Sequence, residues 1–521
     1  MSQSPTKEKR SFAKSVGIIS LITMLSRVMG LLREVVRASL LGTSFYSDAF
    51  TLAFALPNLF RRLTAEGVMS TAFIPIFCEV QKKEGEQRAF DFSRNFFFLL
   101  SLVLSCFALL FILLAPWLVK YIFAAGFQGE ALEVTVFLTQ LMFGYIIFIS
   151  LAAICQGMLN SFSVFWISSL TPVLLNISMI GCALIFAPLL DNPALGFAIG
   201  VLLGGCLQLF AQFPSLRKIG FVWWRPLNFK DPKIKEVARL MVPAIFGAGI
   251  YQINIVIGNL IATTLEEGSL SSLNFSNRLL ELVIGIFVVS LATVILPRLS
   301  HLFIDQQYQQ VEQQLKNVIP LIAFITLPVI VITIILSEEI VTFLFLRGNF
   351  DQRSVLMTAG ALKFHILGLV FISWNRILLT SYQAAKNFRR TVHISAIIML
   401  INLGFAWGLS RSMGHLGIAL ANTISQIAQT LLLLYFLKEM KLFKVMKVYL
   451  EPAMIKNLLL ALLLWPLLFY SKQWLLSLGM SVWVNLPLLG LFSLLLVFLL
   501  ASLLRCRELS EMKGLIRKKR A

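Results

Sequence analysis

The sequence has 521 residues, of which 58% are hydrophobic and only 13% are charged, and its mean hydropathy is +0.84. Soluble proteins carry about 25% charged residues, so this composition excludes a soluble enzyme and predicts a multi-spanning membrane protein. The net charge of +20 does not indicate nucleic-acid binding, because the basic residues are distributed over alternate loops and form no single patch.

In chain order, the hydropathy pattern predicts an all-α integral membrane protein with about 14 transmembrane helices. The expected spans are 15–41, 47–80, 95–122, 133–159, 164–190, 194–214, 234–263, 270–297, 315–346, 356–384, 391–410, 414–437, 449–470 and 482–504. The chain begins with basic residues that lead straight into the first span, without the small-residue cleavage site of a signal peptide.

The loops between these spans predict the orientation of the chain. Basic residues gather on alternate loops and at both ends, whereas the opposite loops hold only Lys120, Arg347, Arg353, Arg411 and Lys472. Cytoplasmic loops carry the excess of Lys and Arg. We therefore expect both termini to be cytoplasmic.

An internal repeat divides the first twelve helices into two sixes. Matching residues recur at offsets between about 221 and 227 positions: Gln156 and Gln383, Asn160 and Asn387, Asn176 and Asn402, Gln208 and Gln429. Six helices is an even number, so the two copies are parallel, as in transporters that rock two lobes about a central site. We expect an N-lobe over residues 1–222, a C-lobe over 223–440, and two C-terminal helices with a basic tail over 441–521.

The stretch 26–77 is apolar enough to enter a membrane and yet carries many charges. At 100° per residue, the polar residues of the first helix fall in one arc, and those of the second helix fall in another. They are Arg27, Arg33, Glu34 and Arg37 in the first arc, and Asp48, Arg62 and Glu66 in the second, with Arg61 about 60° off its edge. Charge at membrane depth is costly, so we expect these helices to line a wet cationic cavity that takes an anionic ligand.

Two structural alternatives stay open for this stretch. Arg62 and Glu66 are four residues apart and could simply pair with each other. Pro57 shifts the phase of the second helix, because a proline in a helix interior kinks its axis. The spacing therefore does not decide whether Arg61 or Arg62 faces the cavity.

In the C-lobe, the span 270–297 is interrupted by polar residues, and Arg278 is the charge that we place in the cavity. Its structural alternative is an ion pair with Glu281, three residues later. Lys363, His365 and Arg376 either line the same cavity or anchor their helix near its ends.

Several kinds of chemistry have no motif in this chain. The sequence contains no P-loop, HExxH or GxSxG motif. Six scattered cysteines without a CxxC and four histidines without ligand spacing predict no disulfide, metal site or cofactor. We therefore expect a protein that is not an enzyme.

The charged stretch resembles the MurJ/MviN family of lipid II flippases, within the multidrug/oligosaccharidyl-lipid/polysaccharide exporter superfamily. The residues that carry the resemblance are Ser26-Arg27-Val28-x-Gly30-x-x-Arg33, Asp48-Ala49-Phe50, Leu56-Pro57-Asn58-Leu59-x-Arg61-Arg62 and Ala65-Glu66-Gly67. Weaker similarity continues through Pro172-x-Leu174-Leu175-Asn176 and Arg278-Leu279 to the end of the chain.

The resemblance implies a function and a set of site residues. Such proteins move lipid II, an undecaprenyl-pyrophosphate-linked disaccharide-pentapeptide, across the bacterial cytoplasmic (inner) membrane for peptidoglycan synthesis, and the two extra helices hold the lipid tail. Matching by position makes Arg27, Arg33, Arg61 and Arg278 substrate-binding, with Asp48 a required acid and Arg62 and Glu66 supporting charges. A sodium site suspected for some members is not expected, because acids are scarce around Gly258 and Asn402.

Membrane lipids are expected partners in addition to lipid II, and the cell-wall synthesis machinery is a candidate partner. Three alternative functions stay open. A flippase for another polyprenyl-pyrophosphate-linked oligosaccharide would share the basic cavity. A multidrug exporter would need an acidic cavity, and a scaffold would depend on the basic tail Arg517-Lys518-Lys519-Arg520.

Overall fold

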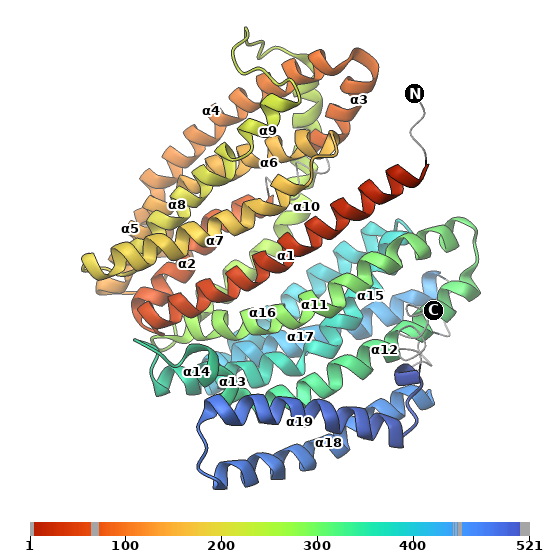
Figure 1. Cartoon of the computed structure of the whole chain (residues 1–521). Helices are drawn as coiled ribbons and strands as arrows, with labels where there is room; N and C mark the ends of the chain where they lie inside the picture. The colour runs from red at the N-terminus through yellow and green to blue at the C-terminus, as the bar shows by residue number, and fades with distance from the viewer. Residues whose placement is uncertain (1–4, 64–71, 441, 443–444, 446–450, 511–521) are drawn as a thin grey trace. The chain divides into compact units, whose positions relative to one another are not determined.

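The computed structural model describes residues 5–63, 72–440, 442, 445 and 451–510, and all regular structure in these ranges is helical. The chain divides into two compact units, each described here by itself (Figure 1). Unit 1 contains residues 1–271 and 348–350, and unit 2 contains residues 272–347 and 351–521. The predicted all-α membrane fold is therefore confirmed, while the predicted lobe boundaries describe the sequence repeat and stay a prediction.

Unit 1 is built from ten α-helices and two short helical turns within the described residues. The helices are α1 (Pro5–Leu41), α2 (Phe45–Arg61), α3 (Ile74–Glu84), α4 (Glu86–Leu118), α5 (Gly129–Phe143), α6 (Tyr145–Ser161), α7 (Trp166–Phe186), α8 (Ala194–Phe210), α9 (Phe213–Lys218) and α10 (Pro232–Thr263), with turns η2 (Val119–Phe123) and η3 (Ala187–Leu189). Helix α1 packs along α7, and α7 packs along α8.

Helix α11 (Ser269–Ile304) starts in unit 1 and continues through unit 2. The other described helices of unit 2 are α12 (Tyr308–Ile335), α13 (Ser337–Phe345), α14 (Gln352–Leu367), α15 (Leu369–Ala384), α16 (Phe388–Met413), α17 (His415–Phe436), α18 (Pro452–Ser477) and α19 (Val482–Leu503), with the turn η4 (Leu437–Met440). Helices α16 and α17 form an extensive antiparallel pair, and α18 packs on α12.

Several predicted spans are broken in the structure. The expected helix 315–346 breaks at Leu336, between α12 and α13. The expected helix 356–384 bends by 44° between α14 and α15, at Gly368. Gly368 has no side chain that could stabilise a continuous helix at this point. The hydrophobic periodicity of 3.6 residues continues on both sides of the bend, so the sequence pattern does not show where the bend lies.

Nine described helices are long and apolar enough to cross a membrane, or up to eleven when each bent pair counts as one span. The predicted count of fourteen is therefore not confirmed. The expected spans 15–41, 47–80 and 234–263 are outside this count. The first two carry the charged stretch, which makes them less apolar than a lipid-facing helix.

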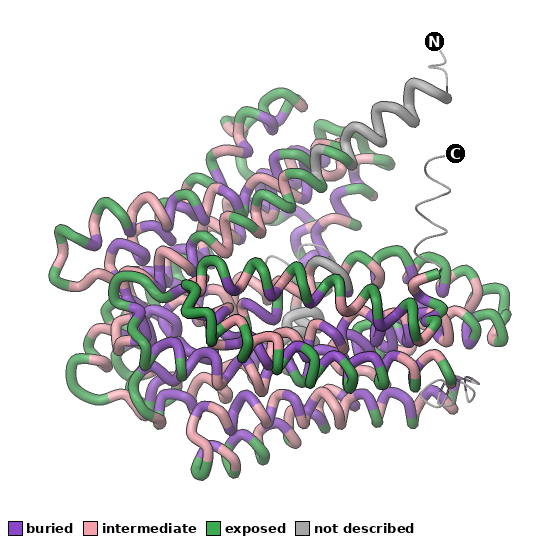
Figure 2. The backbone as a smooth tube through the Cα atoms, turned by 60° about the horizontal axis from the view of Figure 1, so that its bottom comes forward, coloured by how far each residue is buried: buried purple, intermediate pink, exposed green. Residues whose placement is uncertain are grey.

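Each unit has its own hydrophobic core. The larger core of unit 1 is rich in phenylalanine, and the rings of Phe111 and Phe143 stack with their centroids 3.7 Å apart. The core of unit 2 is mostly aliphatic, with Leu315, Ile319 and Ile377 fully buried. Many exposed positions (Figure 2) are apolar side chains on long helices, as lipid contact requires.

A candidate anion-binding site

The charged face of α1 is buried inside unit 1. The exposed fractions of Arg33, Glu34 and Arg37 are 7%, 2% and 4%. The Glu34 carboxylate accepts a hydrogen bond from Arg33 Nε at 3.2 Å and lies 3.1 Å from Arg37 Nη2. One carboxylate thus serves two guanidinium groups, and these three side chains together carry one net positive charge.

Helices α7 and α2 orient the two arginines of this cluster. Arg33 Nη1 donates to Asn176 Oδ1 on α7 at 3.2 Å, and Arg37 Nη1 donates to Thr51 Oγ1 on α2 at 3.4 Å. Asn176 Nδ2 in turn donates to the Ser26 carbonyl oxygen at 3.4 Å. The sequence repeat singled out Asn176, and the helical arc singled out Arg37, but neither pattern predicted that both would belong to this cluster.

Arg27 lies on α1, two turns before the buried cluster. Its side chain is half-buried, and it makes no hydrogen bond or ion pair with any part of the chain that the structure describes. Its charge is therefore not neutralised by a described carboxylate, unlike the charges of Arg33 and Arg37. An anion that approaches this face of α1 would find an available guanidinium group at Arg27.

Asp48, the predicted required acid, caps a helix that lies far away in the sequence. Its carboxylate accepts from the backbone N–H groups of Gly268 and Ser271, at 2.8 and 2.7 Å, at the start of α11. Glu267, just before α11, accepts from the backbone N–H of Phe45 at 2.8 Å, at the start of α2. Each acid thus caps the other helix, where the unpaired N–H groups and the helix dipole favour negative charge.

Close backbone contacts surround this pair of caps. Gly268 has a φ of +88°, and a Cβ atom there would lie 2.5 Å from the Thr43 carbonyl oxygen. Asn349 donates from its backbone N to the Ser39 carbonyl oxygen at 2.8 Å and from Nδ2 to the Leu40 carbonyl oxygen at 2.7 Å. The α1–α2 turn is thereby held by two segments distant in sequence, and only glycine permits the approach at 268.

The remaining charges of the stretch 26–77 are described only in part. Arg61 Nε donates to Asn58 Oδ1 at 2.7 Å, one turn earlier on α2. Arg62 is half-buried, as Arg61 is. Glu66 lies outside the described residues, so its pairing with Arg62 stays a prediction, and so does the choice between Arg61 and Arg62.

The predicted C-lobe charges all lie in unit 2. Arg278 Nη1 is 2.7 Å from the Glu281 carboxylate, and both side chains are about two-fifths exposed. Lys363 pairs with Glu338 of α13 at 2.9 Å, and Arg376 is exposed. The pairing considered for Arg278 is therefore present, but an exposed pair contributes only about 0–1 kcal/mol, so an anion can compete for this arginine.

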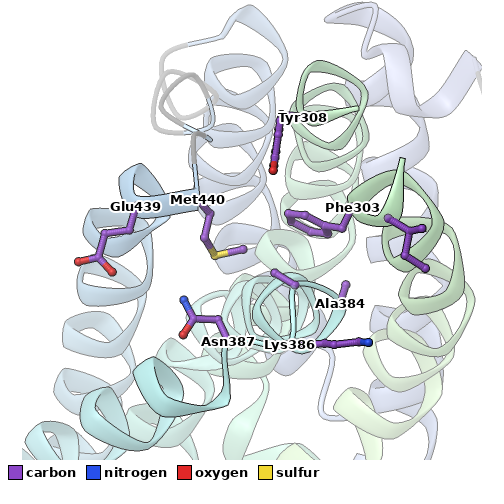
Figure 3. Close-up of a pocket in the computed structure, with 9 residues that line it drawn as sticks. Phe303, Tyr308, Ala384, Lys386, Asn387, Glu439 and Met440 are labelled. Atoms are coloured by element: carbon purple, nitrogen blue, oxygen red, sulfur yellow. The ribbon is translucent and has the colours of Figure 1, made fainter. Parts of the chain in front are cut away.

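A pocket of about 560 Å³ lies in unit 2, apart from these charges (Figure 3). Phe303 and Met440 point toward each other across it, and Lys386 and Asn387 lie at its lower edge in the view. Its walls come from the end of α11, the start of α12, the α15–α16 loop and η4. The α11–α12 connection, the α15–α16 loop and η4 thus meet at one end of unit 2. The charge pattern predicts that all three lie on the same side of the membrane.

Comparison with known proteins agrees with this architecture. Residues 37–487 match the family model described as "Lipid II flippase MurJ". A probable lipid II flippase MurJ of Treponema pallidum is 36% identical over 441 residues, which are 83% of each chain, and a lipid II flippase MurJ of Burkholderia cenocepacia is 32% identical over 432 residues, 82% of this chain and 84% of the relative.

Solved structures give the same assignment. A structure of lipid II flippase MurJ in an inward closed conformation superposes with a TM-score of 0.77 at 26% identity, covering 93% of this chain and 98% of the other. An inward-facing multidrug MATE transporter of the MOP superfamily gives a TM-score of 0.68 at 16% identity, covering 82% and 98%, which shows a shared fold alone.

The helical units, the apolar spans and the buried cationic cluster define a multi-pass membrane transporter. The family match covers most of the chain, and the relatives exceed 30% identity over four-fifths of their length. The chain therefore belongs to the lipid II flippase MurJ family.

Proposed function

We propose that this chain translocates lipid II from the cytoplasmic to the periplasmic leaflet of the bacterial cytoplasmic membrane, with both termini in the cytoplasm. Its membership of the MurJ family and the names of its relatives support this function. The translocation leaves every covalent bond of the lipid intact, so the protein acts as a transporter and not as an enzyme.

The observation that carries the proposal is the excess positive charge on α1. Arg33 and Arg37 share one carboxylate, and Arg27 has no described carboxylate partner. A pyrophosphate carries two negative charges, and planar guanidinium groups bind phosphate oxygens in a bidentate manner. We assign the pyrophosphate to Arg27, Arg33, Arg61 and Arg278, with Asp48, Arg62 and Glu66 as supporting charges.

Translocation proceeds by alternating access. The polar head group enters the cationic site, while the polyprenyl tail stays in lipid beside α18 and α19, whose exposed residues are almost all apolar. Substrate binding changes the conformation only when the two conformations bind the head group with different affinity. The caps that Asp48 and Glu267 provide hold the first turn of α11 on unit 1, so their strength sets part of the free-energy difference between conformations.

The test measures how much lipid II reaches the outer leaflet in cells that depend on this protein. Arg27→Ala, Arg33→Ala and Arg278→Ala are compared with the wild type at matched expression, and we expect lipid II to remain inside in all three. Arg33 is buried, so Arg33→Lys is added: it keeps the charge but loses the bidentate fork, and we expect partial transport.

Arg411→Ala is the matched control, because Arg411 lies in the last turn of α16, away from the predicted site, with its guanidinium carbon 3.8 Å from the ring centroid of Trp407. Normal transport in this control together with loss in the three variants supports the proposal. If lipid II still reaches the outer leaflet after the protein is depleted, and no second flippase is present, lipid II is not the substrate. Another polyprenyl-pyrophosphate-linked oligosaccharide then becomes the substrate to assay.

A further inference from the structure

A chain of buried polar side chains crosses unit 2 and has no role in the function proposed above. It joins four helices through His365 on α14, which is 4% exposed. His365 Nδ1 lies 2.9 Å from Ser276 Oγ on α11, and His365 Nε2 lies 3.3 Å from Asn422 Nδ2 on α17. Asn402 Nδ2 on α16 donates to Asn422 Oδ1 at 2.9 Å and to Ser425 Oγ at 3.1 Å.

The neighbouring hydrogen bonds determine the direction of each bond in this chain. The Ser276 hydroxyl donates its single hydrogen to the Leu273 carbonyl oxygen at 2.9 Å. With this hydrogen engaged, the hydroxyl oxygen accepts from His365, which assigns the ring proton to Nδ1. The amide nitrogen of Asn422 donates to Nε2, which is consequently unprotonated. The structure thus contains a neutral His365 whose two ring nitrogens are both satisfied.

A second proton on His365 would break this arrangement. A protonated Nε2 would be a donor that faces the Asn422 amide nitrogen, which is also a donor. Rotating the Asn422 amide would supply an acceptor, but its nitrogen would then face the Asn402 nitrogen. The Asn402 amide would have to rotate as well, and its nitrogen would then no longer donate to Ser425 Oγ. Because buried donors without acceptors are costly, a protonated His365 is incompatible with this packing of α11, α14, α16 and α17.

The charged groups of the surrounding helices are engaged elsewhere. Lys363 on α14 pairs with Glu338 of α13, and Arg278 on α11 pairs with Glu281. His415 on α17 interacts electrostatically with His365, and its Nε2 lies 3.1 Å from the Met357 carbonyl oxygen. Within the described residues no carboxylate contacts the imidazole of His365 that could stabilise a cation there.

We propose that His365 is a proton-binding site of unit 2, and that taking up and releasing this proton accompanies the conformational cycle of the transporter. The proposal rests on the function proposed above. Ser276, which accepts from His365, precedes Arg278 by two residues on α11, so the switch acts on the helix that carries a substrate-binding arginine. The conformation described here is the deprotonated one, and the protonated one has a different packing of these four helices.

The transport test uses the full chain in proteoliposomes with fluorescent lipid II, at a series of pH values equal on both sides. We expect the wild-type rate to change several-fold as the pH falls from about 7 to about 4, through and below the ordinary pKa of histidine, and His365→Gln to transport at a rate independent of pH. His393→Gln, at an exposed histidine of α16, is the matched control and should retain the wild-type profile. A wild-type profile in His365→Gln would overturn the proposal.

A second measurement does not depend on transport. The chain has four histidines, so NMR of histidine-labelled protein in nanodiscs can follow each imidazole. We expect His365 to start as the Nδ1–H tautomer and to become protonated within the same pH range. Asn422→Asp supplies a carboxylate acceptor for Nε2–H and should move this transition to higher pH.

The two measurements separate the two proposals. A His365 that stays neutral down to about pH 4 in both the wild type and Asn422→Asp would overturn the proton site, whatever the transport result. A wild type that moves no lipid II at any pH would instead overturn the proposed function, and a titrating His365 in that protein would still establish the proton site.

Discussion

The two units place repeat-related asparagines in opposite kinds of polar core. In unit 1, Asn176 accepts from Arg33, inside a buried cluster with one net positive charge. In unit 2, Asn402 donates to Asn422, inside a buried chain without charge. The same amide at the same place in the repeat thus supports an ionic network in one unit and a neutral network in the other.

The difference lies in the partner helices and not in the asparagines. Helix α1 brings Arg33, Glu34 and Arg37 to Asn176 on α7, and burying them is tolerated because Glu34 serves both arginines. Helix α14 brings a single histidine to the corresponding region of unit 2. The two asparagines that the predicted repeat pairs thus both belong to buried polar networks, while the chemistry of each network depends on one neighbouring helix in its own unit.

Among the substitutions that test this difference between the two units, Glu34→Gln is expected to have the largest effect on stability. The substitution removes the carboxylate that Arg33 and Arg37 share, and breaking a buried ion pair costs about 3–5 kcal/mol. We expect the free energy of unfolding in mild detergent to fall by that amount. Glu281→Gln in unit 2 is the control, since its pair with Arg278 is exposed and should cost only about 0–1 kcal/mol. Equal losses in both variants would contradict the ionic character of the unit 1 core.

Replacing Asn176 and Asn402 by aspartate should change the stability of the protein in opposite directions. Asn176→Asp gives Arg33 a second carboxylate and neutralises the cluster, so we expect unchanged or higher stability together with weaker pyrophosphate binding. Asn402→Asp puts an unpaired carboxylate into a neutral core, where an unsatisfied charge costs about 3 kcal/mol or more. Thermal unfolding of both variants at neutral pH checks the prediction, and a loss of similar size in both would refute it.

The helix caps provide a third contrast. Asp48 caps α11 from another helix, at two backbone N–H groups, whereas Asp351 caps its own helix, α14, at Ser354. Asp48→Asn keeps one acceptor and turns an amide donor toward the other N–H, so we expect a loss of about 1–3 kcal/mol. Asp351→Asn should cost less, since asparagine is also a good N-cap. Hydrogen exchange at the amides of Gly268 and Ser271 reports the loss at the cap itself.

The sequence predicts these features to different degrees. The apolar spans, the positions of Arg27, Arg33 and Arg37 on one face and the pairing of Arg278 with Glu281 follow from local periodicity, because each involves residues on one helix. The caps at Asp48 and the contact between Arg33 and Asn176 join residues far apart in the chain, and no local pattern encodes them. The break at Leu336 lies beside Ser337, Glu338 and Glu339, so these polar residues indicate where the apolar span ends, but they do not indicate that a second helix, α13, follows directly.

The smallest expected effect comes from comparing two arginine–carboxylate ion pairs, one in each unit. Arg88 of α4 binds Asp231 at 2.7 and 2.9 Å and thereby holds the N-cap of α10, and Asp231 is buried. In unit 2, Arg390 binds Glu439 at 2.7 and 3.0 Å in a more exposed position. Burial acts to raise the pKa of Asp231, but the hydrogen bonds from Arg88 and from the Lys233 backbone outweigh it and leave this pKa below its ordinary value.

A carboxyl whose pKa is lowered on folding stabilises the protein above its ordinary pKa, near 3.9, and this stability is lost as the pH falls through the folded value. We therefore expect Arg88→Gln to lower the free energy of unfolding by about 1 kcal/mol at neutral pH, and the difference from the wild type to shrink below about pH 4. Arg390→Gln should show a smaller difference, because its partner is already solvated. An Arg88→Gln deficit that stays constant down to pH 2.5 would mean that Arg88 acts through packing of its stem and not through the charge of Asp231.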